Sequence, residues 1–251
     1  MLTFPFTGFA ALNFNGTTQY VDITPRINND EMSIAAWFYK NANDFVNADA
    51  IFGGWYWNSN IQLQEGFDLR FYPTNPTLLS LFLVTTNGTT KTQKGSSFNF
   101  ASISSNGTST KEWFHVVGTY NKTDGNQRLY VNGVLRDIDL HVAGNTIVPF
   151  ATTTAGSCYT TQKIGHSCVS TGYFNGRIAE VKLYNRALSN AEIKLLYYGG
   201  KIYNGLVGYW PLWNVPNLTY EPDFSGGRHY GVRTATPVPV GHPYKAGKYK
   251  K

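Results

Sequence analysis

The chain has 251 residues, of which 14% are charged and 16% are aromatic, and Gly, Asn, Thr and Ser are abundant. This composition favours many short strands joined by turns and excludes an all-helical protein. The formal charge of +6 is confined to residues 226–251, which hold six basic and no acidic side chains. The neutral remainder excludes the basic face of a duplex-binding fold, and the lack of a long apolar run predicts no membrane span.

Alternation of apolar and polar residues predicts strands along most of the chain. In the segment 66–72, Phe67, Leu69 and Phe71 point to one face and the residues between them to the other. The segment 112–120 carries apolar groups on both faces, which is typical of a strand between two packed layers. Further along, Asn132-Gly133 predicts a hairpin with a type I′ turn. The pattern therefore predicts an all-β fold of many antiparallel strands.

One short helix is predicted near Ser189–Tyr198. The run Ser189–Glu192 is a capping box, in which each side chain satisfies a backbone amide of the first turn. Ile193, Leu196 and Tyr197 follow at helical spacing and can lie on a sheet. The helix is therefore interpreted as structural.

Two cysteines and the N-terminus bear on the cellular compartment. Cys158 and Cys168 could form a cross-strand disulfide or remain two buried thiols. The first residues lack a basic segment followed by an apolar one, so no signal peptide is recognised.

Four segments in chain order, from about Ala11 to Tyr198, resemble the laminin-G-like, concanavalin A-like lectin-glucanase jelly-roll family. They are ALNFNGTTQYVDI, MSIAAWFYK with Trp37, KEWFHVVGTYNKTDGNQRLYVNGVLRD, and GYFNGRIAEVKLYNRALSNAEIKLLYY. The resemblance implies a two-sheet jelly-roll sandwich.

The segments Gly205–Leu212 and Asp223–Gly227 follow the predicted helix, whereas many relatives carry their counterparts before the first strand. A jelly roll has neighbouring ends, so such a rotation can leave the sheets intact; a second, truncated module is the alternative. The single-module layout resembles laminin-G-like proteins of phages and environmental viruses. We therefore predict a jelly roll over residues 1–235, with a core at 11–198 and a closing strand and loop at 205–235. A basic, Pro- and Lys-containing tail is predicted at 236–251.

The carboxylates do not form the pattern of a catalytic pair. Glycoside hydrolases of this fold place them at alternate positions of one strand, whereas Glu65 and Asp68 lie three apart and point to opposite faces. We therefore predict that the protein is not an enzyme and requires no cofactor.

A calcium ion is allowed by the family resemblance. Relatives often hold calcium near the loop that corresponds to 223–227, where Asp223 is present and Asn15 could approach it. Arg228 would repel a cation there, and Asp223 could equally cap the turn. Cys158, His166 and Cys168 lack the spacing of a zinc site.

Rings and amides occur together at Trp55, Tyr56, Trp57, Asn58 and Asn60, which makes this segment a candidate glycan-binding site. The same rings could instead pack in the core or against a neighbouring subunit.

The basic tail is either a solvated terminus or an arm that docks on an acidic partner through its lysines, Lys245, Lys248, Lys250 and Lys251. The leading hypothesis is a non-catalytic virion decoration protein on a phage capsid or fibre, located on the virion surface or outside the cell. A carbohydrate-binding module for surface glycans is the alternative, and a degenerate glycoside hydrolase the third. Capsid or fibre subunits, a glycan or further copies of the chain are the expected partners, without nucleic acid or membrane.

Overall fold

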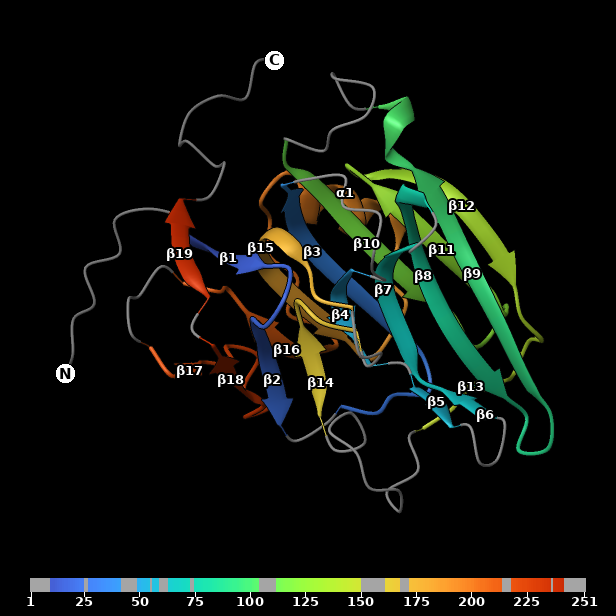
Figure 1. Ribbon diagram of the computed structural model, residues 1–251. Coiled ribbons are helices and arrows are strands. Elements are labelled where there is room, and N and C mark those ends of the chain that lie inside the picture. Colours follow the sequence, from blue (N-terminus) through green and yellow to red (C-terminus); the bar gives the residue numbers. More distant parts are fainter. Residues whose placement is uncertain are drawn as a thin grey trace.

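Two antiparallel sheets pack face to face in the computed structural model, with one short helix on the outside (Figure 1). The structure describes residues 10–24, 27–41, 49–54, 56–58, 63–72, 75–103, 112–149, 161–167, 172–213, 218–235 and 237–241. This arrangement confirms the predicted jelly-roll sandwich.

Sheet A has eight strands in the order β12-β11-β10-β3-β15-β1-β19, with β16 beside β15. Their bounds are β1 Ala10–Asn15, β3 Met32–Lys40, β10 Phe114–Tyr120, β11 Asn126–Val131, β12 Val134–Leu140, β15 Asn175–Tyr184, β16 Leu206–Trp210 and β19 Val238–Gly241. Strands β1 and β16 lie end to end along the same edge of β15, because β1 pairs with its first half and β16 with its second.

Sheet B has nine strands in the order β13-β8-β7-β4-β14-β2-β18-β17, and β9 pairs with β8 as well. Strands β7 and β13 pair with successive parts of one edge of β8, and β9 pairs with the opposite edge. Their bounds are β2 Tyr20–Thr24, β4 Ala50–Gly53, β7 Phe67–Tyr72, β8 Asn75–Thr86, β9 Lys91–Asn99, β13 Thr146–Ile147, β14 Gln162–Ile164, β17 Tyr220–Glu221 and β18 Tyr230–Thr234. A separate hairpin joins β5 Tyr56–Asn58 to β6 Leu63–Glu65, and a 3-10 turn, η1, spans Phe100–Ser102.

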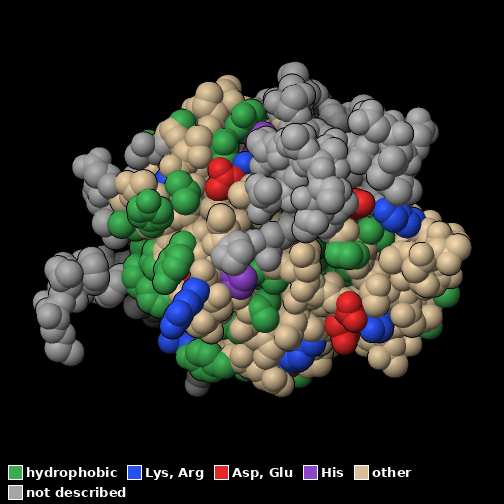
Figure 2. All heavy atoms as spheres, turned by 90° about the horizontal axis from the view of Figure 1, so that it is seen from below, with side chains coloured by type: hydrophobic (Ala, Val, Ile, Leu, Met, Phe, Trp, Pro, Cys, Tyr) green, Lys and Arg blue, Asp and Glu red, His purple; other side chains and the backbone are tan. Residues whose placement is uncertain are grey.

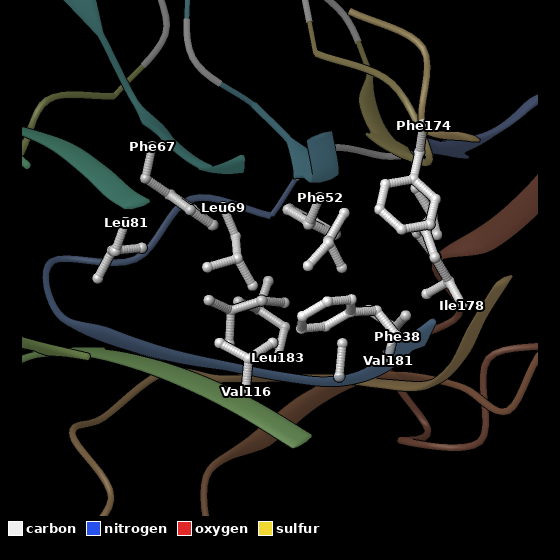
Figure 3. Packing of buried hydrophobic residues seen from close by; sticks show 14 of the residues in the cluster. Phe38, Phe52, Phe67, Leu69, Leu81, Val116, Phe174, Ile178, Val181 and Leu183 are labelled. Carbon is white, nitrogen blue, oxygen red and sulfur yellow. The ribbon is translucent and has the colours of Figure 1, made fainter. Parts of the chain in front are cut away.

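The core lies between the two sheets and is rich in aromatic rings (Figure 3). Phe38 of β3 meets Phe71 of β7 edge-on, with ring centroids 5.6 Å apart. Phe67, Leu69 and Phe71 all belong to this core, as their alternation predicts. Burying side chains of this size from both sheets supplies most of the hydrophobic stabilisation.

The helix α1, Asn190–Tyr197, covers part of the outer face of sheet A (Figure 1). Its capping box is present: the amide of Ser189 donates to Glu192 Oε2 at 2.9 Å, and Ser189 Oγ accepts from the amide of Glu192. Ile193 and Leu196 are buried against the sheet. The predicted helix is confirmed. The predicted type I′ turn is confirmed as well, since Asn132 and Gly133 have φ of 51° and 74°.

The strands after α1 complete both sheets. β16 and β19 join sheet A, while β17 and β18 join sheet B through β2. The predicted tail boundary at 236 is therefore wrong, because Val238–Gly241 pairs with β1. Pro239 is compatible with a strand at the edge of a sheet, where its missing amide leaves no ladder bond unmade.

Candidate functional site

The predicted ring-and-amide segment lies largely beyond the described residues. Trp55 and Asn60 fall outside them, and for Tyr56–Asn58 only the backbone is described, as strand β5 paired with β6. Two other predictions also fall outside, namely the cysteine pair and the lysines of the tail. Those residues are Cys158, Cys168, Lys245, Lys248, Lys250 and Lys251.

Asp223 organises its own loop. Its Oδ1 accepts hydrogen bonds from the amides of Tyr209 and Ser225, at 2.9 and 2.8 Å, and its Oδ2 accepts one from the amide of His229 at 2.9 Å. Three backbone donors occupy most of the lone pairs of one carboxylate, so little remains for a cation. The geometry is that of a turn-capping residue.

Asn15 does not share a site with Asp223. Its Oδ1 accepts from the amides of Thr17 and Thr18 at 3.0 Å each, within its own turn. Asn15 pairs with Asn175 of β15, whereas Tyr209 pairs with a position seven residues further along that strand, about 20 Å away. The two residues therefore do not fit a common calcium ion. Across the described ranges, no three His, Cys, Asp or Glu side chains are grouped as a metal site would require.

Large aromatic side chains are exposed beside the Asp223 loop. Tyr220 is 59% exposed and Phe224 47%, and Figure 2 shows apolar side chains gathered on the side of the molecule where Figure 1 places β17 and β18. The ring of Phe224 contacts Trp213, with centroids 4.3 Å apart. The described side chains of this group are aromatic rings with no amide among them, which differs from a sugar site.

The carboxylates considered for catalysis are buried and occupied. Glu65 lies 3.4 Å from Lys91 Nζ, and Asp68 Oδ1 accepts the amide of Gly54 at 2.7 Å. Both residues are at most 5% exposed. Glu65 connects the β5–β6 hairpin to β9, and Asp68 connects β7 to the residue after β4.

A different set of side chains combines rings, amides and a cation on the outer face of sheet A. We call this set the aromatic–amide face. It consists of Asn13, Tyr39, Asn41, Trp113, Asn175 and Arg177. All six are half-buried, and they come from β1, β3, β15 and the residues next to β3 and β10.

The ring side of this face is a row across three neighbouring strands. Trp113 directly precedes β10, and its ring centroid lies 5.9 Å from that of Tyr39. Tyr39 pairs with Arg177 of β15, whose guanidinium Cζ lies 4.8 Å from the Tyr39 ring centroid. The row continues to Asn13 of β1, the partner of Arg177 on its other side. Two rings, a guanidinium and an amide are thus adjacent in register.

The amide side is a hydrogen-bonded ladder. Asn41 Nδ2 donates to Asn13 Oδ1 at 3.4 Å and to Asn175 Oδ1 at 3.3 Å. Within the described part of the chain, Asn13 Nδ2 and Asn41 Oδ1 make no hydrogen bond. The ladder therefore fixes the amides and leaves a donor and an acceptor for a ligand.

Gly176 permits this arrangement locally. It lies between Asn175 and Arg177 with φ of 151°, and a Cβ there would lie 2.1 Å from the Tyr39 carbonyl oxygen. Only glycine allows β15 to approach β3 so closely. Its neighbours on both sides then point outward beside Tyr39.

Sequence reasoning missed this face because its members are spread over four separate segments. The alternation in MSIAAWFYK identifies Tyr39 as facing away from Phe38, but which strands flank it depends on strand order. Sheet order is a long-range property that local periodicity does not encode.

The family model for the concanavalin A-like lectin/glucanases superfamily, of the laminin-G type, matches residues 15–194. The chain belongs to this family, and the predicted resemblance is confirmed. The structure also resembles that of a Bacteroides ovatus ATCC 8483 protein assigned to carbohydrate binding, with a TM-score of 0.65 and 18% identity, over 96% of this chain and 62% of that one.

Two further relatives have narrower overlap. The receptor-binding domain of botulinum neurotoxin D has a TM-score of 0.52 and 19% identity, over 79% of this chain and 45% of that chain. Human pentraxin-related protein PTX3 is 32% identical over 87 residues, 33% of this chain and 22% of that protein. The chain thus spans about three fifths of the bacterial structure and about one fifth of the curated relative. Across the described residues, no helix is long and apolar enough to cross a membrane.

Proposed function

We propose that the protein is a non-catalytic, glycan-binding module of the concanavalin A-like type and that it binds sugars through the aromatic–amide face. The observation that carries the proposal is the row of Trp113, Tyr39 and Arg177 beside the Asn ladder. A pyranose offers an apolar face that stacks on a ring and hydroxyls that bond to amides. The family and the carbohydrate-binding assignment of the bacterial structure support the same class of ligand.

The absence of catalysis is part of the proposal. Hydrolysis of a glycoside needs two carboxylates across the scissile bond. On the aromatic–amide face no member is acidic, and Glu65 and Asp68 are buried among protein partners. A degenerate hydrolase is therefore less well supported than a binding module, and we expect no release of reducing sugar from glycans that the protein binds.

The test is a glycan array followed by titration calorimetry with the best ligand. Trp113→Ala and Tyr39→Ala should each weaken binding at least tenfold, because each removes a stacking surface. Tyr203→Ala is the matched control, since its ring is 71% exposed elsewhere on the molecule, and it should bind as the wild type does.

A second pair, Trp55→Ala and Trp57→Ala, tests the segment predicted from the sequence. If these variants lose binding while Trp113→Ala and Tyr39→Ala keep it, the ligand binds at that segment and the aromatic–amide face is not the site. Thermal melts of all variants distinguish lost binding from lost folding.

A role in decorating a virion is the second candidate, with the protein located on a particle or outside the cell. It is motivated by the order of segments after α1 and by the basic residues of 242–251. Sedimentation and electron microscopy test it: ordered arrays or symmetric oligomers are expected. A monomer without such contacts at high concentration would contradict this role and leave glycan binding unaffected.

A further inference from the structure

Arg177 differs from most arginines of the described chain. Arg128 pairs with Asp124 at 2.8 Å, Arg186 pairs with Glu192 at 2.6 Å, and Arg233 pairs with the buried Glu221. Arg177 has no carboxylate partner among the described residues and makes only the contact with the Tyr39 ring. Its Nε is buried and without a hydrogen-bond partner.

This environment orders the guanidinium without neutralising it. Stacking on a ring limits the rotamers of a long side chain, and the planar group keeps its N–H donors at its edge. The buried Nε is closed to a ligand, whereas the two Nη atoms are not buried and make no hydrogen bond with the described residues, so an acceptor would approach the guanidinium there. Carboxylate and sulfate oxygens match the fork of a guanidinium, so this geometry favours an anion as the missing partner.

The rest of the face is electrically neutral. Its other five members are two aromatic residues and three asparagines, so Arg177 is the single formal charge of the set. An anionic ligand would meet one cation and no acidic member of this face. The row from Arg177 to Trp113 spans two strand spacings, about 10 Å, which suits an oligosaccharide.

We infer that the aromatic–amide face selects acidic oligosaccharides, with a carboxylate or sulfate group on Arg177 and a neighbouring ring stacked on Trp113. The inference rests on the proposed function and names the class of sugar that this same face recognises. Asn13 and Asn41 then bond to hydroxyls beside the anion.

Three probes of the same length test it by calorimetry at physiological salt: a uronic-acid tetrasaccharide, its methyl ester and a sulfated tetrasaccharide. The wild type should bind an acidic probe at least tenfold more tightly than the ester. A preference for the uronic acid assigns a carboxylate site, and a preference for the sulfated probe assigns a sulfate site. Equal affinity for the ester and both acidic probes overturns the inference and leaves glycan binding intact.

The variants separate a built site from general attraction of charges. Arg177→Gln should reduce affinity for the acidic probe to that for the ester and leave affinity for the ester within twofold. Arg177→Lys should retain part of the preference, because it keeps the charge and loses the fork. Arg228→Gln, which removes an exposed cation from another loop, should keep the full preference.

Loss of the preference in Arg228→Gln to the same degree as in Arg177→Gln would overturn the inference in favour of non-specific electrostatics. If no probe and no arrayed glycan binds the wild type, the proposed function fails together with the inference. Melting curves of the variants at Arg177 show whether the fold is retained, and the affinity for the ester provides a second readout that a misfolded variant would lose.

Discussion

The outer face of sheet A has two halves that the same strands build differently. Under α1, β3 and β10 contribute the small or slender side chains Ala35 and Val117, which are buried with Ile193 and Leu196 of the helix. Four residues after Ala35, β3 instead contributes a half-buried aromatic, Tyr39. Small side chains let a helix approach the sheet, whereas rings and amides occur where no helix covers it.

A bulge in β15 separates the two halves. Ala179 pairs with Trp37 and Lys182 pairs with Ala35, so one extra residue is inserted on β15. Glu180 lies within this irregularity with φ of 55°. Such a bulge bends the strand and increases its twist. The bulge thus divides one sheet face into an end that packs against α1 and an uncovered end that we propose binds glycan.

Acid should have the largest effect, since three histidines are buried in neutral form. Burial and Lys182 lower the pKa of His115 from 6.5 to about 3, and burial lowers the pKa values of His141 and His166 to about 4. Below pH 6.5 the unfolded chain takes up these protons and the folded chain does not. The free energy of unfolding is therefore highest above pH 6.5 and decreases as the pH is lowered. His115 alone should contribute a loss on the order of 3 kcal/mol by pH 4.

Urea unfolding at pH 7, 6, 5 and 4 measures this loss. His115 is in ring contact with Trp37 and Tyr197, between the two halves, so His115→Phe keeps a ring there and removes the proton. The variant should show a shallower dependence of unfolding free energy on pH. An unchanged slope would show that the folded protein accepts the proton on His115.

The next effect concerns the covered half. Leu196→Ala should lower the free energy of unfolding by about 3 kcal/mol, because it leaves a cavity between α1 and the sheet. Leu195→Ala on the same helix is the control; its side chain is 47% exposed and its loss should cost less than about 0.5 kcal/mol. Both variants should bind glycan normally, and a loss of binding in Leu196→Ala would show that the two halves are coupled.

Gly176→Ala perturbs the uncovered half through its backbone. The added Cβ meets the Tyr39 carbonyl, so we expect a loss of about 2 kcal/mol and weaker glycan binding. Gly88→Ala is the matched control, since Gly88 also has positive φ, 94°, but has open space around it. Its cost should be about 1 kcal/mol, without an effect on binding. If thermal melts show the same loss of stability for Gly176→Ala and Gly88→Ala, β15 and β3 can move apart to accommodate the added Cβ.

The smallest effect is expected at the start of α1. Ser189→Ala removes the cap and should cost about 1 kcal/mol, because the amide of Glu192 loses its acceptor. Ser189→Thr preserves the hydroxyl and should remain close to the wild type. Calorimetric melts measure both, and a Thr variant as unstable as the Ala variant would mean that the hydroxyl is not what stabilises the helix.

The sequence predicted those features that depend on neighbouring residues. The capping box at Ser189, the turn at Asn132-Gly133 and the alternation of Phe67, Leu69 and Phe71 are local patterns, and each is present. Family resemblance supplied the two-sheet arrangement that alternation alone leaves open.

The candidate site was harder to predict because its parts are distant in the chain. Asn13 and Arg177 are cross-strand partners, yet 164 positions separate them. Val238–Gly241 lies in the basic, proline-containing ending of the chain, whose composition predicts a tail, and only its pairing with β1 reveals a strand. The sequence allows Asp223 to be either a cation ligand or a turn cap, and the hydrogen bonds from three backbone amides favour the cap.

The pairing of β1 with β19 has a consequence for the order in which the molecule can fold. Ala10 and Gly241 are partners, so β1 is synthesised about 230 residues before the strand that covers its outer edge. β2 likewise lacks β18 until late. During synthesis both edges can pair with other nascent chains. When many ribosomes translate one mRNA at the same time, neighbouring nascent chains should therefore exchange strands more often. Chaperones that bind the N-terminal strands during synthesis should raise the yield of monomer.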